Sequence, residues 1–113
     1  MVLRDDQLAI CQRYGAIFEA ADNDTVVGLS RNVRPSAFPL HGLRHLPTGQ
    51  TCGWYIWAGD YSDADDFFEP VHVAHLTELC PHVLPYLGLA PGWRFLLAPD
   101  YADVWYDVAL LNS

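Results

Sequence analysis

The sequence predicts an α+β domain, in which an N-terminal helix and a second helix pack on a mainly antiparallel sheet of about four to five strands. Three observations lead to this fold class: an apolar helical period near the N-terminus, two glycine-led aromatic runs, and short connections near the C-terminus. The aromatic runs, GWYIWAGD at residues 53–60 and GWRFLL at residues 92–97, have the composition of buried strands. Short connections favour antiparallel pairing of consecutive strands.

The first helix is predicted over roughly residues 4–21, where apolar residues recur at steps of three and four. Gly15 falls inside this stripe and either weakens the helix or marks a close approach to the sheet, and Asn23 is the expected stop. Residues 25–30 are short and β-branched and predict the first strand. The irregular segment that follows could contain a further strand over residues 40–46.

The run at residues 53–57 predicts the central strand of the sheet. Trp54 and Ile56 point to one side of this strand, and Tyr55 and Trp57 point to the other. Because both sides are large and apolar, we expect this strand to lie in the centre of the sheet.

The second helix is predicted to begin at Pro70, which suits a first helical turn, and to end or reset at Pro81. Residues 82–87 then form a further helical turn, residues 93–97 the next strand and residues 103–108 the last strand. The expected core comprises Trp54, Ile56, Trp93, Phe95, Val104 and Tyr106, covered by the first helix through Ile10, Tyr14 and Ile17.

The length and composition predict one cytoplasmic domain over residues 1–113. Hydrophobic residues make up 51% of the chain, which is enough for a buried core, but no apolar run is long enough to cross a bilayer. The N-terminus lacks the basic-then-apolar order of a signal peptide. Cys11, Cys52 and Cys80 are odd in number and scattered, which fits a reducing compartment.

The charge favours a protein partner. The net charge is -8, and all six cations are arginines. An acidic field of this size repels phosphate backbones and anionic lipids, so nucleic acid and membranes are not expected partners, whereas a basic protein is. The alternative that the acidity only maintains solubility stays open.

Neither the histidines nor the cysteines form a recognisable metal or catalytic pattern. His72 and His75 are three residues apart with Cys80 beyond, and His41 and His45 are four apart, but zinc needs three or four converging ligands. Cys52 lacks a local histidine base. We therefore expect no metal, no cofactor and no catalytic residue, with a small metal- or cysteine-dependent enzyme as the alternative.

The densest charge follows the central strand, where five carboxylates are interspersed with Tyr61, Phe67 and Phe68. An EF-hand would need a central glycine that this segment lacks. The segment is therefore either a solvated acidic loop or a surface with apolar anchors for a protein partner. The predicted partner-binding residues are Asp60, Tyr61, Asp63, Asp65, Asp66 and Glu69.

Five segments together resemble a known bacterial family. They are GWYIW at residues 53–57, DFFEPVH at 66–72, PYL at 85–87, PGWRFL at 91–96 and YADVWYD at 101–107.

The likeness spans roughly residues 25–111 and is to the immunity-protein-thirty-three-like family, whose small domains are proposed to protect bacteria from polymorphic or contact-delivered toxins. The resemblance implies a non-catalytic cytoplasmic immunity protein that binds and neutralises a cognate toxin, and the acidity of the chain favours a basic one. A homodimer or another homo-oligomeric structural module stays an open alternative.

Overall fold

The computed structural model describes residues 3–112, so residues 1, 2 and 113 of the expected domain lie outside it. The α+β class is confirmed. Short 3₁₀ helices are labelled η. The elements are α1 (Leu3–Tyr14), β1 (Val26–Ser30), β2 (Leu40–Arg44), β3 (Thr51–Ala58), β4 (Phe68–His72), η1 (Val73–His75), α2 (Leu76–Leu79), η2 (Pro81–Tyr86), β5 (Trp93–Ala98), β6 (Tyr101–Tyr106) and η3 (Val108–Asn112).

Within the described residues, six strands form one sheet in the order β4-β1-β3-β2-β5-β6, which corrects the expected four to five. β1 and β3 are parallel, and the other four pairs are antiparallel. β3 lies between β1 and β2, as its two apolar sides predicted. The predicted strand within residues 40–46 is present as β2.

The strand that the sequence reasoning missed is β4, at the edge of the sheet. Pro70 does not open a helix but lies within β4, opposite Gly28 of β1. Proline has no N–H to donate, and an edge strand tolerates it because one side of that strand has no hydrogen-bonding neighbour. The predicted second helix is consequently reduced to η1 and the four residues of α2.

α1 ends at Tyr14, well before the predicted end near residue 21. Gly15 adopts a φ of 71°, a left-handed conformation that glycine takes without strain. The Ala16 N–H donates to the Cys11 carbonyl at 2.8 Å and the Gly15 N–H to the Gln12 carbonyl at 3.4 Å, which is a Schellman ending. Gly15, not Asn23, is therefore the stop signal.

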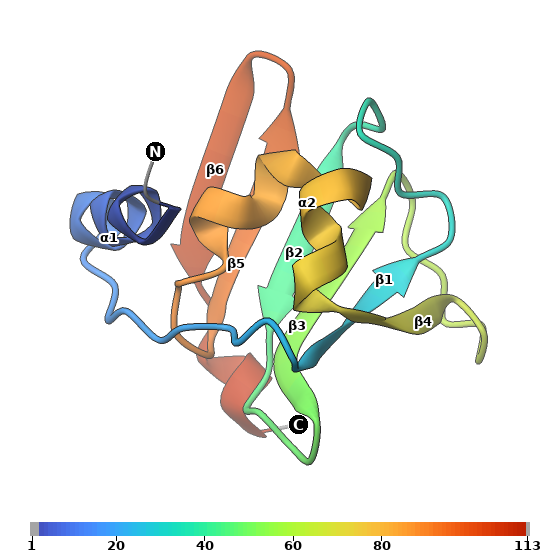
Figure 1. Ribbon diagram of the computed structural model, residues 1–113, viewed down its shortest axis with the longest axis horizontal. Coiled ribbons are helices and arrows are strands. Elements are labelled where there is room, and N and C mark those ends of the chain that lie inside the picture. Colours follow the sequence, from blue (N-terminus) through green and yellow to red (C-terminus); the bar gives the residue numbers. More distant parts are fainter. Residues whose placement is uncertain (1–2, 113) are drawn as a thin grey trace.

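The helical layer is also arranged differently from the expectation. Figure 1 shows α2 and the turns after it in front of the sheet, whereas α1 lies beside the sheet. α1 packs on η2, where the Gln7 side-chain amide donates to the Leu84 carbonyl at 2.9 Å. Ile17 lies beyond the helix and is 77% exposed, so it covers no part of the core. The other two predicted covering residues, Ile10 and Tyr14, are half-buried and pack against the core.

Most of the predicted core is buried. Trp54, Ile56, Phe95 and Val104 are buried, and Trp93 is half-buried. Tyr106 is 49% exposed, which is a correction. It is the last residue of the edge strand β6, where its ring packs against Trp93 and Gly92 at the margin of the sheet.

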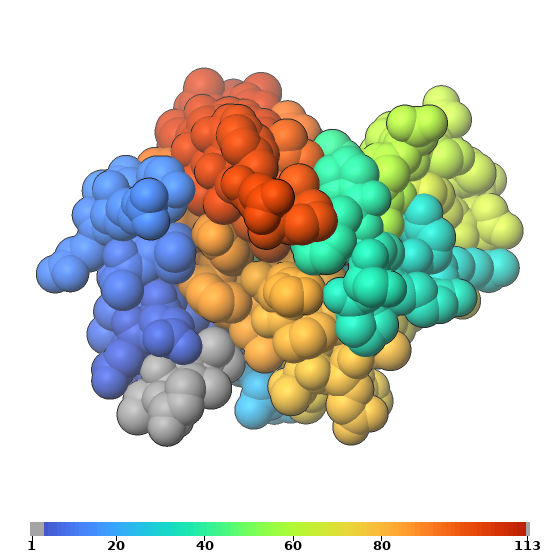
Figure 2. Space-filling view, turned by 90° about the horizontal axis from the view of Figure 1, so that it is seen from above, coloured from blue at the N-terminus to red at the C-terminus, as the bar shows by residue number. Residues whose placement is uncertain are grey.

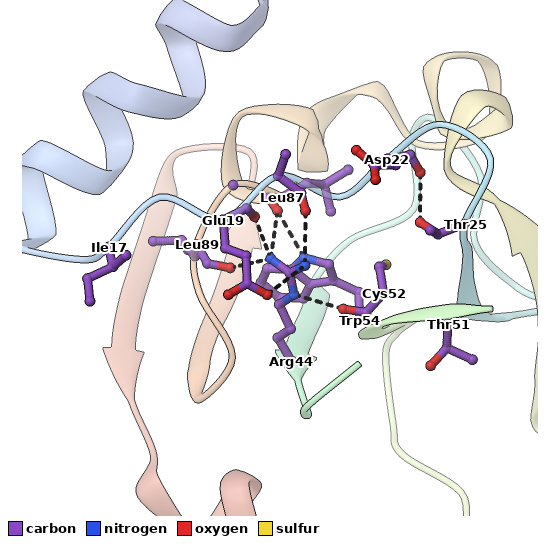
Figure 3. Close-up of polar contacts among 12 residues, drawn as sticks. Ile17, Glu19, Asp22, Thr25, Arg44, Thr51, Cys52, Trp54, Leu87 and Leu89 are labelled. Atoms are coloured by element: carbon purple, nitrogen blue, oxygen red, sulfur yellow. Dashed lines mark hydrogen bonds and ion pairs between the residues drawn. The ribbon is translucent and has the colours of Figure 1, made fainter. Parts of the chain in front are cut away.

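A buried arginine, Arg44, joins the sheet to the segments packed on it (Figure 3). Its Nε donates to the Cys52 carbonyl at 2.9 Å, and one terminal nitrogen donates to the carbonyls of Glu19 at 2.7 Å and Leu89 at 2.8 Å. The Glu19 carboxylate lies 3.8 Å from its other nitrogen. Burial lowers the pKa of Arg44, while Cys52 and Glu19 oppose that change. One side chain thus fixes β2, β3 and two loops.

Candidate functional site

The face of the sheet turned away from α2 and η2, which we call the open face, is the candidate functional site. Side chains of successive strand residues point to opposite faces of a sheet. Gly42 and Arg44 of β2 are buried on the covered face, so His41 and Leu43, next to them, point to the open face. Cross-strand pairing sets these side chains in two rows, namely Tyr55, Leu43, Arg94 and Trp105, and Trp57, His41, Leu96 and Asp103.

A groove of about 700 Å³ lies on the open face. Its floor consists of strand residues, its first wall is the segment that follows β2, and its second wall is formed by Tyr61 and Phe68. The lining residues are Leu43, His45, Leu46, Pro47, Thr48, Tyr55, Trp57, Tyr61 and Phe68. The groove is therefore mainly apolar and aromatic, as is common for binding sites.

Aromatic contacts fasten the acidic loop, residues 59–67, to the sheet. The Tyr61 ring meets Trp57 edge-to-face at 5.4 Å and Phe67 at 5.6 Å between centroids. Phe68 meets Tyr55 in the same way at 5.2 Å. Such edge-to-face pairs are favourable beyond the area that they bury. Tyr61 nevertheless stays 60% exposed, so its outer side is accessible.

Gly28 makes room for the floor of the groove. A Cβ atom at this position would lie 2.6 Å from Cδ1 of Tyr55, closer than carbon atoms approach. The Tyr55 ring therefore lies over the backbone of β1. On the other face, Gly42 makes room for the ring of Phe95 in the same way.

His41 and Trp57 stack on the open face with ring centroids 5.0 Å apart and planes 10° apart. Burial and the nearby charge of Arg94 lower the pKa of His41, while a backbone hydrogen bond involving Gly59 and the charge of Asp60 oppose this. The neutral imidazole is thus favoured in the folded protein.

The structure brings some of the predicted partner-binding residues to the groove and leaves others apart. Tyr61 lines the groove, and Asp60, Asp63, Asp65 and Asp66 are exposed on the same loop, with Asp66 lining a separate depression next to Arg31. Figure 2 shows this loop (yellow-green) and the β5–β6 hairpin (orange-red) standing apart, with a hollow between them, on the side away from the helices.

Glu69 belongs to a different surface. It pairs with buried Leu29 in the register of β4 and β1, which directs it to the other face of the sheet. Its carboxylate lies 3.1 Å from Arg31. In contrast, none of the ion pairs within residues 3–112 involves an aspartate of the acidic loop.

Sequence reasoning missed the strand residues of the groove, above all Leu43, Tyr55 and Trp57. The alternation in residues 53–57 carried the signal, because it showed a second apolar side of the central strand. On that side Tyr55 is half-buried, whereas Trp57 is buried, with the rings of His41 and Tyr61 packed against it.

Within residues 3–112, the histidines and cysteines of the sequence analysis do not gather into a set of metal ligands. His72 and His75 have rings 5.9 Å apart, but the described part of the chain contains no group of three or more His, Cys, Asp or Glu that could hold a metal ion. Burial raises the pKa of the Cys11 thiol and raises the pKa of Cys80 to about 11. A protonated thiol is a weak nucleophile, so neither residue suits covalent catalysis.

By its fold and its groove, the protein is a small α+β domain. Helices cover one face of its sheet, and the other face carries an aromatic groove. No helix in residues 3–112 has the length and apolar character needed to span a membrane.

The chain belongs to the Imm33-like domain family, because the family model matches residues 6–107. This match confirms the resemblance found in the sequence. Neither the curated proteins nor the solved structures gave a match.

Proposed function

We propose that this protein is a non-catalytic immunity protein, which binds and neutralises a cognate bacterial toxin in the cytoplasm. The observation that carries the proposal is membership in the Imm33-like domain family over residues 6–107. The aromatic groove supports it, since an inhibitor needs an accessible apolar surface more than it needs catalytic groups.

The net charge of -8 supports a basic toxin as the partner. Opposite charges on two proteins accelerate their encounter and disfavour incorrect partners. We place the contact surface on the acidic loop, through Asp60, Tyr61, Asp63, Asp65 and Asp66. Glu69, the sixth predicted residue, faces the other side of the sheet on the edge strand β4 and is not part of this surface.

The first test is protection. The proposal predicts that a toxin gene lies beside this gene. Cells that express its product should survive when they also express this protein, and the two purified proteins should form a complex. Growth arrest despite full expression of the folded protein, together with no complex, would exclude the function.

The second test locates the charge effect. Asp63→Arg/Asp66→Arg should slow association with that toxin about tenfold at low ionic strength and reduce its salt dependence. Asp22→Arg/Asp24→Arg is the matched control, because both aspartates are exposed and the change in net charge is the same. Equal effects of the two double variants would show that only the net charge matters.

A further inference from the structure

We propose that the groove on the open face is an anchor site for one long cationic side chain, an arginine or a lysine, of the toxin. This inference rests on the proposed function and adds the chemistry of the contact. The partner segment would lie across β2 and β3, with its cation between the aromatic rings and the acidic loop.

The shape of the groove sets the first requirement. The exposed Leu46 and Pro47 form one wall and Tyr61 forms the other, with Leu43 and Tyr55 between them. A side chain that enters must therefore present apolar surface along its stem. Arginine and lysine have such stems and keep their charge at the tip.

The rings set the second requirement. Trp57 is buried and its ring stacks on His41, so the rings that an entering side chain can reach are the exposed Tyr61 and the half-buried Tyr55 and Phe68. The face of an aromatic ring carries partial negative charge and attracts a cation within about 6 Å of its centroid. The protein already uses this contact elsewhere, where the Arg94 guanidinium carbon lies 5.4 Å from the Trp105 ring centroid.

The charges set the third requirement. Two arginines approach the open face or its edge, and both have partners: Arg94 lies 3.2 Å from Asp107 and Arg31 lies 3.1 Å from Glu69. The aspartates of the acidic loop have no ion-pair partner among the described residues. A cation from the toxin would relieve the repulsion between these carboxylates, which a neutral or acidic side chain could not do.

The chain provides a matched pair of tyrosines for the test. Asp60-Tyr61-Ser62-Asp63 and Asp100-Tyr101-Ala102-Asp103 have the same pattern, and their tyrosines are 60% and 55% exposed. Only Tyr61 lines the groove. Tyr61→Ala should therefore accelerate dissociation of the neighbouring gene's toxin about tenfold or more, whereas Tyr101→Ala should change it less than about twofold. Tyr61→Phe should restore slow dissociation because it keeps the ring.

The toxin side identifies the anchor. In the toxin, each arginine and lysine is replaced in turn by methionine, and each exposed aromatic or aliphatic residue by alanine. The dissociation of every toxin variant is measured from the wild-type protein and from Tyr61→Ala. One cation should lose most of its effect in the Tyr61→Ala background, because the two residues would share one contact. Strong coupling of Tyr61 to an apolar toxin residue, and to no cation, would overturn the proposal.

The outcomes separate this inference from the function on which it rests. If the toxin binds tightly and neither Tyr61→Ala nor Tyr101→Ala changes its dissociation, the immunity function stands and the anchor site is refuted. Failure of the wild type to bind or protect would refute both. A second copy of this chain could also occupy the groove, and sedimentation of the wild type and of Leu46→Glu tests this alternative. A wild-type dimer that Leu46→Glu dissociates would assign the groove to self-association and overturn the proposal.

Discussion

Arg44 of β2 and Trp54 of β3 are cross-strand partners whose side chains reach the same carbonyl, that of Leu87. The Trp54 indole N–H donates to it at 3.0 Å, and a guanidinium nitrogen of Arg44 lies 3.4 Å away. The Arg44 guanidinium also lies over the indole, 5.7 Å from the ring centroid. The sheet is therefore joined to the segment after η2 by polar contacts inside the core.

Arg44→Met should destabilise the protein by at least about 3 kcal/mol, because it leaves several buried carbonyls without a donor. Urea denaturation measures this change in the free energy of unfolding. Arg31→Met is the control: it removes an ion pair whose side chains are 63% and 50% exposed, and such pairs contribute less than about 1 kcal/mol. Similar losses in the two variants would contradict the role of Arg44.

Gly42→Ala should destabilise the protein by about 1–3 kcal/mol, because the added methyl group overlaps the buried ring of Phe95. Phe95→Leu in the same chain makes room for that methyl group. The double variant should thus be more stable than the sum of the two single losses predicts, as measured by a double-mutant cycle. Strict additivity would mean that the ring and the glycine do not compete for space.

The stability should fall as the pH drops below about 6.5, in part because of His41. Its pKa is lowered in the folded protein by burial and by Arg94, so the unfolded chain binds more protons in this range. The stabilisation is complete above the unfolded pKa and is lost as the pH falls toward the folded one. Urea denaturation at a series of pH values should show a shallower decline for His41→Gln, whereas an unchanged slope would refute this assignment.

The Cys80 thiol should react slowly with a thiol reagent in the native state. Its side chain is fully buried and its pKa is raised to about 11, so the thiolate is scarce and shielded at pH 8. Reaction should become fast in denaturing urea. Mass spectrometry after a short exposure to iodoacetamide would identify rapid native labelling of Cys80, which would contradict the burial.

Local patterns in the sequence predicted the interior of the sheet well. The alternation around Trp54 placed β3 in the centre, and the β-branched run before Ser30 predicted β1. The same reasoning failed at Pro70, because proline is tolerated both at the first turn of a helix and on an edge strand. Only the pairing of β4 with β1 distinguishes the two. It also failed at Gly15, where the apolar stripe continued past a left-handed turn.

The candidate site was harder to predict than the fold. The loop that carries Tyr61 was visible as acidic and aromatic sequence. Its neighbours across the groove, Leu43 and Leu46, are distant in sequence and come close only through strand pairing and the turn after β2. The apolar pattern of Tyr55 and Trp57 also cannot show whether a second layer covers them. That depends on where the helices pack.

The alternation in β2 has a consequence for how such a protein can diverge. Gly42 and Arg44 face the core, while Leu43, between them, faces the groove. Substitutions at Leu43 or Tyr61 can therefore accumulate and alter recognition while the neighbouring positions keep the fold. Under the proposed function, we expect relatives with different toxin partners to share the inward residues of β2 and β3 and to differ at the outward ones, so that a new specificity arises without a new scaffold.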